Sequence, residues 1–326
     1  MLLVTGGAGF IGSNVVAALN EAGRTDVIVN DVLGAEGKWR NLAKRQVADV
    51  VAPADLFRWL DSRKLDAVIH MGAISDTTAT DADLVMENNF RTSMRLLDWC
   101  TDARVPFIYA SSAATYGDGG EGFSDDWSPA ALQKLQPMNL YGWSKQLFDQ
   151  AVSERFVKKE KLPPQWAGLK FFNVFGPNEY HKGEMMSLVA KRFDDAKAGR
   201  TVRLFKSHRP GIGDGEQRRD FIYVDDAVAV VRWLMASPQV SGIFNVGTGN
   251  ARSFRELILA GYAALGTKPN IEYVEMPDNM RAGYQYFTQA PTARLLAAGY
   301  NGGFTPLEEA VRQYVTGYLD TPDPYR

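Results

Sequence analysis

A tyrosine and a lysine stand four residues apart in the segment Tyr141-Gly-Trp-Ser-Lys145, a spacing that can support acid and base chemistry. If the segment is helical, 3.6 residues per turn place the phenol and the ammonium on one face. A free tyrosine ionises near ~10, and a neighbouring ammonium favours the phenolate, so Tyr141 could take a proton near neutral pH. The same spacing also occurs by chance on solvated helices, so the pair needs support from the rest of the chain.

The first residues of the chain supply that support. Leu2-Leu-Val-Thr5 reads as a buried strand, and Gly6-Gly-Ala-Gly9-Phe-Ile-Gly12 follows it as a tight turn and the start of a helix. Such glycines let the backbone approach a pyrophosphate, whose charge the first amides of the helix stabilise. A glycine turn can also merely solve a packing problem. Combined with the Tyr141 pair, it predicts an enzyme that uses a nicotinamide dinucleotide.

Two charged residues bear on which dinucleotide this is. Asp31 ends the second apolar run, where a carboxylate accepts hydrogen bonds from the adenosine ribose hydroxyls, which favours NAD. Lys38 in the same loop could neutralise the extra phosphate of NADP, or it could be a solvated lysine. The residues alone leave NAD and NADP both open.

Ser112 ends the fourth apolar run, where its hydroxyl could bond the substrate oxygen that Tyr141 deprotonates. The alternative is a serine that satisfies backbone groups at a strand end. Enzymes of this architecture that eliminate water need an acidic pair at the positions of Ala113 and Ala114. A methyl group cannot transfer a proton, so dehydration is disfavoured.

Other side chains have weaker patterns. Lys182 could enter the crevice opposite Tyr141, although a loop lysine is usually solvated. The arginines 209, 218 and 219 could clamp a diphosphate through planar guanidinium groups, or they could be exposed charges. The histidines 70, 181 and 208 are too scattered for a metal triad, and His70 reads as a core residue, so we predict no metal.

The elements that position these residues follow a βαβ rhythm. Apolar runs at 2–4, 27–29, 67–69 and 107–109 alternate with amphipathic stretches. This pattern predicts an α/β fold, with a Rossmann-type doubly wound parallel sheet and a smaller α/β substrate-binding lobe. We place the dinucleotide-binding domain at 1–172 plus a returning segment at about 220–250, and the substrate-binding lobe at 173–219 and 251–326. The runs 220–224 and 242–246 read as strands that return to the first domain, and the polar stretch 206–218 reads as a flap.

Composition narrows the class of protein. The 326 residues carry a formal net charge of −2, which gives no reason to expect nucleic acid or an anionic membrane as a partner. Cys100 is the only cysteine, so no disulfide can form within the chain. No stretch approaches the roughly 20 apolar residues that span a bilayer, and no basic and apolar leader precedes the first strand. We therefore expect a cytoplasmic protein.

The glycine turn, Ser112, Tyr141 and Lys145 together resemble the extended short-chain dehydrogenase/reductase family, whose members act mainly on nucleotide sugars. The resemblance spans nearly the whole chain. Within that family, four segments resemble the epimerases of ADP-linked heptoses: Val4-Thr-Gly-Gly-Ala-Gly-Phe-Ile-Gly-Ser-Asn14, Tyr109-Ala-Ser-Ser-Ala-Ala-Thr-Tyr-Gly117, His181-Lys-Gly183 and Tyr284-Gln-Tyr-Phe-Thr-Gln289.

This resemblance implies bound NADP, an ADP-linked heptose as the substrate, and inversion at C6 of the heptose by transient oxidation. It assigns the second acid/base role to Lys182, with Ser112 and Lys145 supporting Tyr141, and it suggests a homo-oligomer, specifically a homopentamer. Two alternatives stay open: another nucleotide-sugar epimerase or reductase of the family, and a non-catalytic dinucleotide-binding subunit. The intact Ser112, Tyr141 and Lys145 argue against the second.

The resemblance also implies particular contacts. The residues expected to bind the cofactor are Gly6, Gly9, Phe10, Ile11, Gly12, Asp31, Val32, Lys38, Met71, Gly72, Ala73, Ile74, Ser75, Asn88, Lys145 and Val174. Those expected to bind the substrate are Ser112, Asn173, Glu184, Lys191, Phe205, Lys206, Ser207, His208, Arg219 and Tyr284. Glu184 and Lys191 depart from the family pattern, which has a small polar residue and a histidine at these positions.

Overall fold

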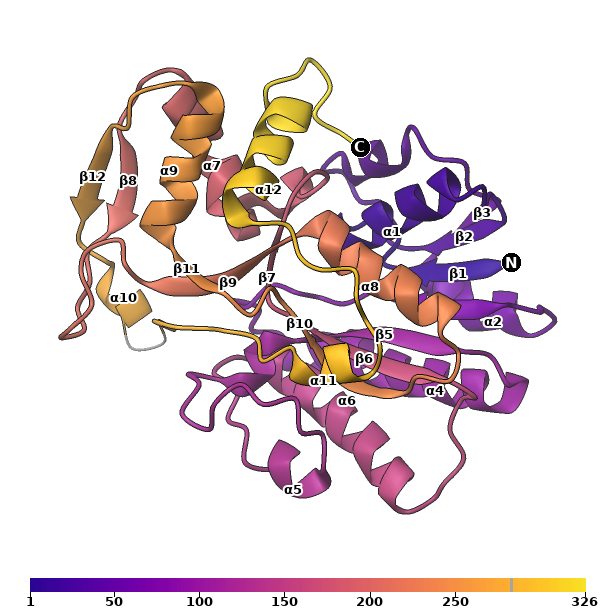
Figure 1. Cartoon of the computed structure of the whole chain (residues 1–326). Helices are drawn as coiled ribbons and strands as arrows, with labels where there is room; N and C mark the ends of the chain where they lie inside the picture. The colour runs from indigo at the N-terminus through magenta and orange to yellow at the C-terminus, as the bar shows by residue number, and fades with distance from the viewer. Residues whose placement is uncertain (282–283) are drawn as a thin grey trace.

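A seven-stranded parallel sheet forms the centre of the protein, whose computed structural model describes residues 1–281 and 284–326 (Figure 1). The strands are, in sheet order, β10 (Gly242–Val246), β6 (Trp166–Phe171), β5 (Phe107–Ser112), β4 (Ala67–His70), β1 (Leu2–Thr5), β2 (Val27–Asn30) and β3 (Asp49–Val51). The order reverses between β1 and β4, which is where ligands bind in open sheets of this kind. The Rossmann-type prediction is confirmed.

Both faces of the sheet are buried, because successive side chains of a strand point to opposite sides. In β1, Leu2 and Val4 join one hydrophobic cluster with residues of α1 (Phe10–Glu21) and α8 (Val224–Ala236). Leu3 joins a second cluster with residues of α4 (Thr92–Ala103) and α6 (Leu140–Val157). Figure 1 shows these helix pairs on opposite sides of the sheet. The apolar runs are nearly continuous because neither face meets water.

The remaining helices are short or belong to the second lobe. The other α-helices are α2 (Leu56–Leu60), α3 (Ala82–Met86), α5 (Pro129–Leu132), α7 (Leu188–Lys197), α9 (Phe254–Leu265), α10 (Asp278–Arg281), α11 (Ala293–Ala297) and α12 (Leu307–Tyr314). Single 3₁₀ or π turns form η1 (Lys38–Leu42), η2 (Pro53–Asp55), η3 (Glu87–Arg91), η4 (Ala113–Tyr116), η5 (Tyr180–Met185) and η6 (Val315–Leu319).

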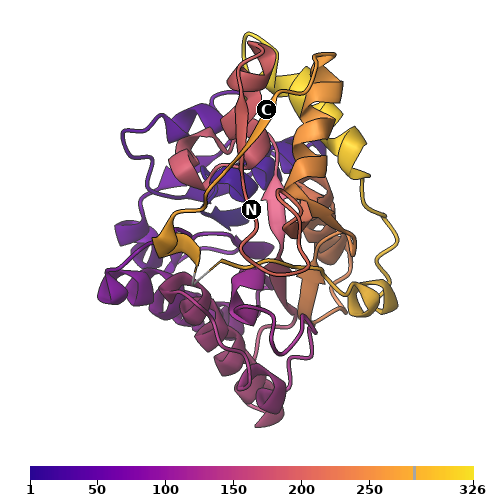
Figure 2. The ribbon, with the colours of Figure 1, turned by 90° about the vertical axis from the view of Figure 1, so that its left-hand side faces the viewer.

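Two smaller sheets build the second lobe. A three-stranded sheet contains, in order, β11 (Ala251–Ser253), β9 (Arg218–Tyr223) and β7 (Asn173–Phe175), and a two-stranded sheet pairs β12 (Ile271–Val274) with β8 (Val202–Phe205). Leu204 of β8 and Tyr262 of α9 belong to a separate hydrophobic cluster of this lobe. Figures 1 and 2 place this lobe and the long helix α6 at opposite ends of the molecule.

The two runs expected to return to the first domain take different partners. The run 242–246 joins the large sheet as β10 beside β6, whereas residues 220–223 belong to β9, which pairs with β7 and β11. Strand character follows from local sequence, but the choice of partner strand depends on contacts distant in the chain. The polar stretch 206–217 is irregular, as expected.

A C-terminal segment, residues 320–326, returns to the first helix of the chain. The Arg326 guanidinium donates to Asn14 Oδ1 at 3.2 Å and to Glu21 Oε2 at 3.0 Å, both in α1. The Arg326 N–H donates to Asn178 Oδ1 at 2.9 Å, and the Tyr180 hydroxyl donates to the carbonyl of Pro324 at 2.8 Å. This segment therefore supports the turn that leads into η5.

Over 1–281 and 284–326, no helix combines the length and apolar character needed to cross a membrane. Over the same ranges, no group of three or more His, Cys, Asp or Glu side chains is placed to hold a metal ion.

Candidate active site

The glycine turn after β1 is built for close approach. Gly6 has a φ of 64°, and a Cβ atom there would lie 2.6 Å from the backbone nitrogen of Gly72. A Cβ on Gly12 would lie 2.1 Å from the carbonyl oxygen of Gly6. Helix α1 starts at Gly9 without a side-chain cap, so its first N–H groups face the cavity beside it. A bare turn and an uncapped helix start suit a pyrophosphate, so these residues fit a dinucleotide.

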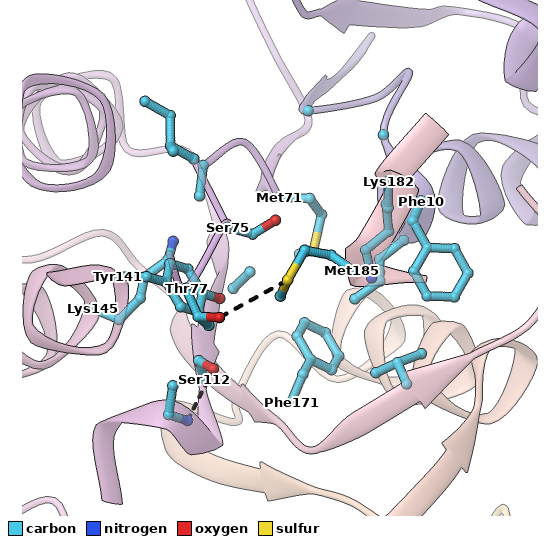
Figure 3. Close-up of a pocket in the computed structure, with 18 of the residues that line it drawn as sticks. Phe10, Met71, Ser75, Thr77, Ser112, Tyr141, Lys145, Phe171, Lys182 and Met185 are labelled. Atoms are coloured by element: carbon cyan, nitrogen blue, oxygen red, sulfur yellow. Dashed lines mark hydrogen bonds between the residues drawn. The ribbon is translucent and has the colours of Figure 1, made fainter. Parts of the chain in front are cut away.

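A cavity of about 1000 Å³ opens along the carboxyl ends of the strands (Figure 3). It extends from the glycine turn past β2, β4 and β5 to η5 of the second lobe. The sequence-predicted residues in its walls are Gly6, Gly9, Phe10, Ile11, Gly12, Asp31, Val32, Lys38, Met71, Gly72, Ala73, Ile74, Ser75, Asn88, Ser112, Tyr141, Lys145, Asn173, Val174, Lys182, Arg219 and Tyr284.

Six residues predicted to bind substrate are not part of those walls: Glu184, Lys191, Phe205, Lys206, Ser207 and His208. Glu184 is 95% exposed and pairs with Lys191 at 2.7 Å. Lys206 pairs with Glu275 at 2.9 Å. The ring of Phe205 lies 6.5 Å from that of Tyr284, so this loop borders the cavity without lining it. A substrate-binding role for these six stays a prediction.

Among the three arginines considered for a diphosphate clamp, only Arg219 lines the cavity. Arg219 is buried, and burial lowers the pKa of its guanidinium, an effect that Tyr284 opposes. Arg218 instead donates to the carbonyl of Ala251 at 3.2 Å, and Arg209 lies over the ring of Tyr286.

Helix α6 presents Tyr141 and Lys145 to the cavity from its first turns. Asn139 caps the helix by accepting from the Gly142 N–H at 2.8 Å. Lys145 is 2% exposed, and burial lowers the pKa of its ammonium to about 8, although Asp149 acts in the opposite direction. The four-residue spacing thus places the phenol and the ammonium in one site, as predicted.

The charge state of Tyr141 differs from the expectation. Burial raises the pKa of Tyr141 above its ordinary value, Asp149 raises it further, and the Ser112 hydroxyl acts in the opposite direction. We expected Lys145 to lower this pKa. Desolvation of the phenolate dominates instead, so the protein alone does not hold Tyr141 ionised.

Ser112 lies at the end of β5 and performs the backbone role that was its alternative interpretation. Its Oγ accepts from the Ala114 N–H at 3.1 Å and caps η4. A hydroxyl that accepts in this way can still donate its own hydrogen, so a substrate contact is compatible with the cap.

His70 lies beneath this wall as the core residue that was expected. Its Nδ1 lies 2.6 Å from Thr5 Oγ1, and its Nε2 lies 2.8 Å from Ser93 Oγ. Burial, with a smaller effect from the Lys145 charge, lowers the pKa of His70 to about 3. The ring is therefore neutral and fully hydrogen-bonded.

Lys182 approaches the cavity from η5. Its Nζ lies 5.1 Å from the centre of the Phe10 ring, and Figure 3 shows these two side chains across the cavity from Tyr141, Lys145 and Ser112. Burial lowers the pKa of Lys182, and Glu179 acts in the opposite direction. A half-buried lysine with a lowered pKa can exchange a proton more readily than a solvated one.

Glu179 is a residue that the sequence analysis missed. It is fully buried, and its carboxylate accepts from the N–H and the hydroxyl of Ser187, both at 2.6 Å, and from the Tyr314 hydroxyl at 3.1 Å. The Lys182 N–H donates to the Glu179 carbonyl at 3.0 Å. The only signal in the sequence is an acidic residue three positions before Lys182.

Asn41 is a second missed residue, and it joins the two lobes. Its side-chain amide lies 2.9 Å from the Ala8 carbonyl, 3.1 Å from the Asn178 carbonyl and 3.2 Å from His181 Nδ1. Burial, with Lys38 and Lys182 as further causes, lowers the pKa of His181 to about 4. His181 therefore stays neutral beside Lys182.

Asp31 and Lys38 form a close pair at the far end of the cavity. The Lys38 ammonium lies 2.5 Å from Asp31 Oδ1, and Asp31 also accepts from the N–H groups of Ala8 and Val32. The Asp31 carboxylate could accept from the hydroxyls of an adenosine ribose, and the Lys38 ammonium could contact a phosphate on that ribose.

Further residues in the cavity walls were not predicted from the sequence. Thr77 and Met185 face each other, with the threonine hydroxyl 3.9 Å from the sulfur (Figure 3). Others in the walls are Asn30, Pro53, Thr78, Thr92, Met138, Asn139, Phe171, Met186, Leu188, Phe254 and Gln285.

Comparisons with known proteins agree with this architecture. Residues 2–247 match the NAD dependent epimerase/dehydratase family. Two curated relatives, from Fusobacterium nucleatum (45% identical) and Nitratidesulfovibrio vulgaris (47% identical), match over 100% of both chains, and both carry the name ADP-L-glycero-D-manno-heptose-6-epimerase.

Solved structures give the same result. The Helicobacter pylori ADP-L-glycero-D-manno-heptose-6-epimerase superposes with a TM-score of 0.81 and 30% identity, covering 97% of this chain and 95% of that one. The Thermus thermophilus UDP-glucose 4-epimerase in complex with NAD superposes with a TM-score of 0.75 and 27% identity, covering 97% of each chain. The chain therefore belongs to the NAD dependent epimerase/dehydratase family and, within it, to the ADP-L-glycero-D-manno-heptose-6-epimerases.

Proposed function

We propose that this protein inverts C6 of the heptose in ADP-D-glycero-D-manno-heptose, giving ADP-L-glycero-D-manno-heptose, by transient oxidation with bound NADP. One observation carries the proposal. Two proton-transfer groups, Tyr141 and Lys182, lie on opposite walls of a single cavity that begins at a dinucleotide-type glycine turn. An enzyme that only oxidises or reduces needs one such group, whereas a second group on the opposite wall allows C6 to be inverted while the sugar ring stays in place.

Tyr141 is the group that takes the proton of the C6 hydroxyl in one epimer. Lys145 stabilises the phenolate as it forms, because an ammonium with a pKa near 8 is still largely charged at neutral pH. Ser112 donates a hydrogen bond to the same sugar oxygen. The glycine turn would hold a nicotinamide dinucleotide in this cavity, and the cofactor would supply reversible hydride transfer at C6 with no net oxidation.

Lys182 protonates or deprotonates the oxygen when the sugar presents the other face of C6. Its half-buried position beside Phe10 lowers the cost of losing its proton, and Glu179 favours the protonated form again. These opposite influences keep the ammonium able to act as acid in one direction and as base in the other. His181, which stays neutral, adds no competing charge.

We propose NADP rather than NAD because of Lys38. Its ammonium lies beside the Asp31 carboxylate at the end of β2, where the adenosine ribose of a dinucleotide would lie. Lys38 could turn from Asp31 to a 2′-phosphate. The Asp31 carboxylate alone would favour the free hydroxyl of NAD, so this assignment depends on measured affinities.

Two measurements test the function. Mass spectrometry of the ligand that copurifies with the native protein identifies the dinucleotide. Incubation with ADP-D-glycero-D-manno-heptose, followed by nuclear magnetic resonance of the sugar, is expected to show the L-glycero epimer without net formation of reduced cofactor. Turnover of UDP-glucose but not of the ADP-heptose would contradict the proposal and favour another nucleotide-sugar epimerase of the family.

A further inference from the structure

A buried ion pair lies behind the Tyr141 wall of the cavity. Lys170 Nζ of β6 is 3.0 Å from Asp149 Oδ2 of α6, and the two side chains are 1% and 0% exposed. Neither residue lines the cavity. Burying two charges costs several kcal/mol per ion, and well-packed apolar residues of similar size are often as stable. The pair therefore needs an explanation beyond stability.

Every polar atom of the pair has partners. Asp149 accepts from the Tyr109 hydroxyl at 3.1 Å and from the Ser111 hydroxyl at 2.6 Å. Lys170 donates to Thr115 Oγ1 at 2.7 Å and lies 4.8 Å from the centre of the Tyr116 ring. A fully satisfied buried network fixes the relative positions of the elements that contribute to it.

The elements it joins are those that carry the proton-transfer groups. Asp149 follows Lys145 by four residues and Tyr141 by eight, so all three lie on one face of α6. On the other side, Thr115 donates to the carbonyl of Ser112 at 2.8 Å, and Lys170 is the cross-strand partner of Ser111. The network thus extends from Asp149, through Lys170 and Thr115, to Ser112, and the Asp149 charge also acts on the Lys145 ammonium one turn earlier on α6.

We propose that Asp149 and Lys170 are positioning residues, which hold Tyr141, Lys145 and Ser112 in one arrangement and balance the charge behind the Lys145 ammonium. The inference rests on the proposed function, because it assigns these two residues to the proton transfer made by Tyr141. Lys170 lies 3.0 Å from the Asp149 carboxylate, and Asp149 in turn favours the charged form of Lys145.

The other charged and titratable groups around the pair lie on α6, β4, β5, η4 and α11, and they include Tyr109 of β5, which donates to Asp149. Lys145 faces Asp149 on its own helix and His70 of β4, and Tyr141 faces Ser112 of β5 and Asp149. Lys170 faces Tyr116 of η4 and acts on Asp125, which also interacts with Arg294 of α11. Of these groups, Asp149 is the anion that raises the pKa of both Tyr141 and Lys145, so its removal should move the titration of both.

The test is the pH dependence of kcat/KM for two single variants and their double. Asp149→Asn removes that anion, so the rise of kcat/KM with pH should move down by about one pH unit. Lys170→Met leaves the Asp149 carboxylate without its ion-pair partner, so the rise of kcat/KM should move to higher pH by a similar amount. The double variant Asp149→Asn/Lys170→Met should return to within a few tenths of a unit of the wild type. Opposite shifts that cancel cannot result from loosened packing.

Arg155→Met is the matched control, because Arg155 of α6 forms a partly exposed ion pair with Asp98 of α4, away from the cavity walls. It should leave the profile unchanged. Two single variants that lower kcat with no shift, or with shifts in the same direction, would overturn the inference.

Two provisions keep the test decisive. If a single variant does not fold, Thr115→Val removes the link to Ser112 while keeping both charges. It should lower kcat at every pH, and an unchanged kcat would overturn the positioning role.

The pKa of Tyr141 can also be measured without substrate, from the tyrosinate absorbance of dinucleotide-bound protein that disappears in Tyr141→Phe. Loss of wild-type turnover would then contradict the proposed function alone, whereas unshifted absorbance titrations would contradict this inference alone.

Discussion

The two walls of the cavity differ in how they are built. The Tyr141 wall consists of regular elements, α6 and the end of β5, and the side chains behind it are fully buried. The Lys182 wall is a short irregular turn, η5, in which Gly183 has a φ of 53°, and much of it is half-exposed. It is held by Glu179, by Asn41 and by the C-terminal segment.

This difference follows from what each wall does in the proposed reaction. The group that works with Ser112 and Lys145 must keep a fixed geometry, which a helix packed on a sheet provides. The group on the opposite face must admit a sugar between itself and the nicotinamide site. Because the hydrogen bonds that support η5 lie on its side away from the cavity, they leave the Lys182 side of the cavity open.

Tyr141→Phe should have the largest effect, because it removes the proton-transfer hydroxyl from the rigid wall and keeps the ring. We expect a loss of ~10² to 10⁴ in the rate of epimerisation. The measurement is turnover of the ADP-heptose, with dinucleotide affinity expected to stay unchanged. Tyr273→Phe in β12, which does not line the cavity, is the matched control. A variant that keeps half of the wild-type rate would remove Tyr141 from the mechanism.

Lys182→Met should separate the two walls functionally. We expect epimerisation to fall by about 10² or more, while one sugar epimer still reduces the bound nicotinamide through Tyr141. Absorbance of the reduced nicotinamide is recorded after mixing with each epimer separately, and the epimer ratio is recorded at long times. Lys158→Met, an exposed lysine just after α6 that pairs with Glu154, is the control. Full epimerisation at the wild-type rate would return Lys182 to the role of a solvated loop residue.

Lys38→Ala should weaken NADP by about 1.5 to 3 kcal/mol and NAD by much less, since a charge-assisted contact to the phosphate is lost. Titration of both dinucleotides measures this. The change should also raise the pKa of His181, because the Lys38 charge helps to lower it. Equal losses for both dinucleotides would contradict the NADP assignment. Lys44→Ala, outside the cavity walls, serves as the control.

The smallest effect that we expect is the loss of unfolding free energy at acid pH. The pKa of His181 falls to about 4 in the folded protein, below its unfolded value of about 6.5. The unfolded chain therefore binds more protons between these values, so the contribution to stability is complete above pH 6.5 and is lost as the pH falls towards 4.

We expect His181 to account for about 1 to 2 kcal/mol of unfolding free energy lost between neutral pH and pH 4.5. Urea unfolding at several pH values measures the slope, which His181→Gln should reduce and His208→Gln should not. In wild-type protein, histidine resonances should show His181 titrating near 4 before His70, whose pKa is about 3. If His70 took up a proton before His181 as the pH falls, the Tyr141 wall would be the one more accessible to acid.

The same contrast explains what the sequence could and could not predict. Tyr141, Lys145 and Ser112 belong to local patterns on regular elements, so helical spacing and a strand end, together with the glycine turn, placed them in one site. Glu179 and Asn41 act through hydrogen bonds to residues far away in the chain, such as Tyr314 and Asn178, and no local pattern reports those partners. The rise in the pKa of Tyr141 within the protein alone could not be predicted for the same reason, because burial is a property of the whole fold.

The fold shows a similar limit. Six of the seven strands of the large sheet follow from apolar runs, but β3 was missed because Asp49 and Val50 are exposed and the strand is only three residues long. The strand over 218–223 was recognised, yet its sheet was not, since pairing partners are chosen by tertiary contacts.

The C-terminal segment also has a consequence for the order in which this protein folds. Arg326 and Asn14 are 312 positions apart, among the longest loops that the chain closes. Strands β1 to β5 can pair once the first third of the chain has been synthesised, because their contacts are nearly local. The Lys182 turn gains its rear support only when residues 324–326 have left the ribosome. The dinucleotide half of the site should therefore mature first, and the capacity to invert a carbon should be the last property that a nascent chain acquires.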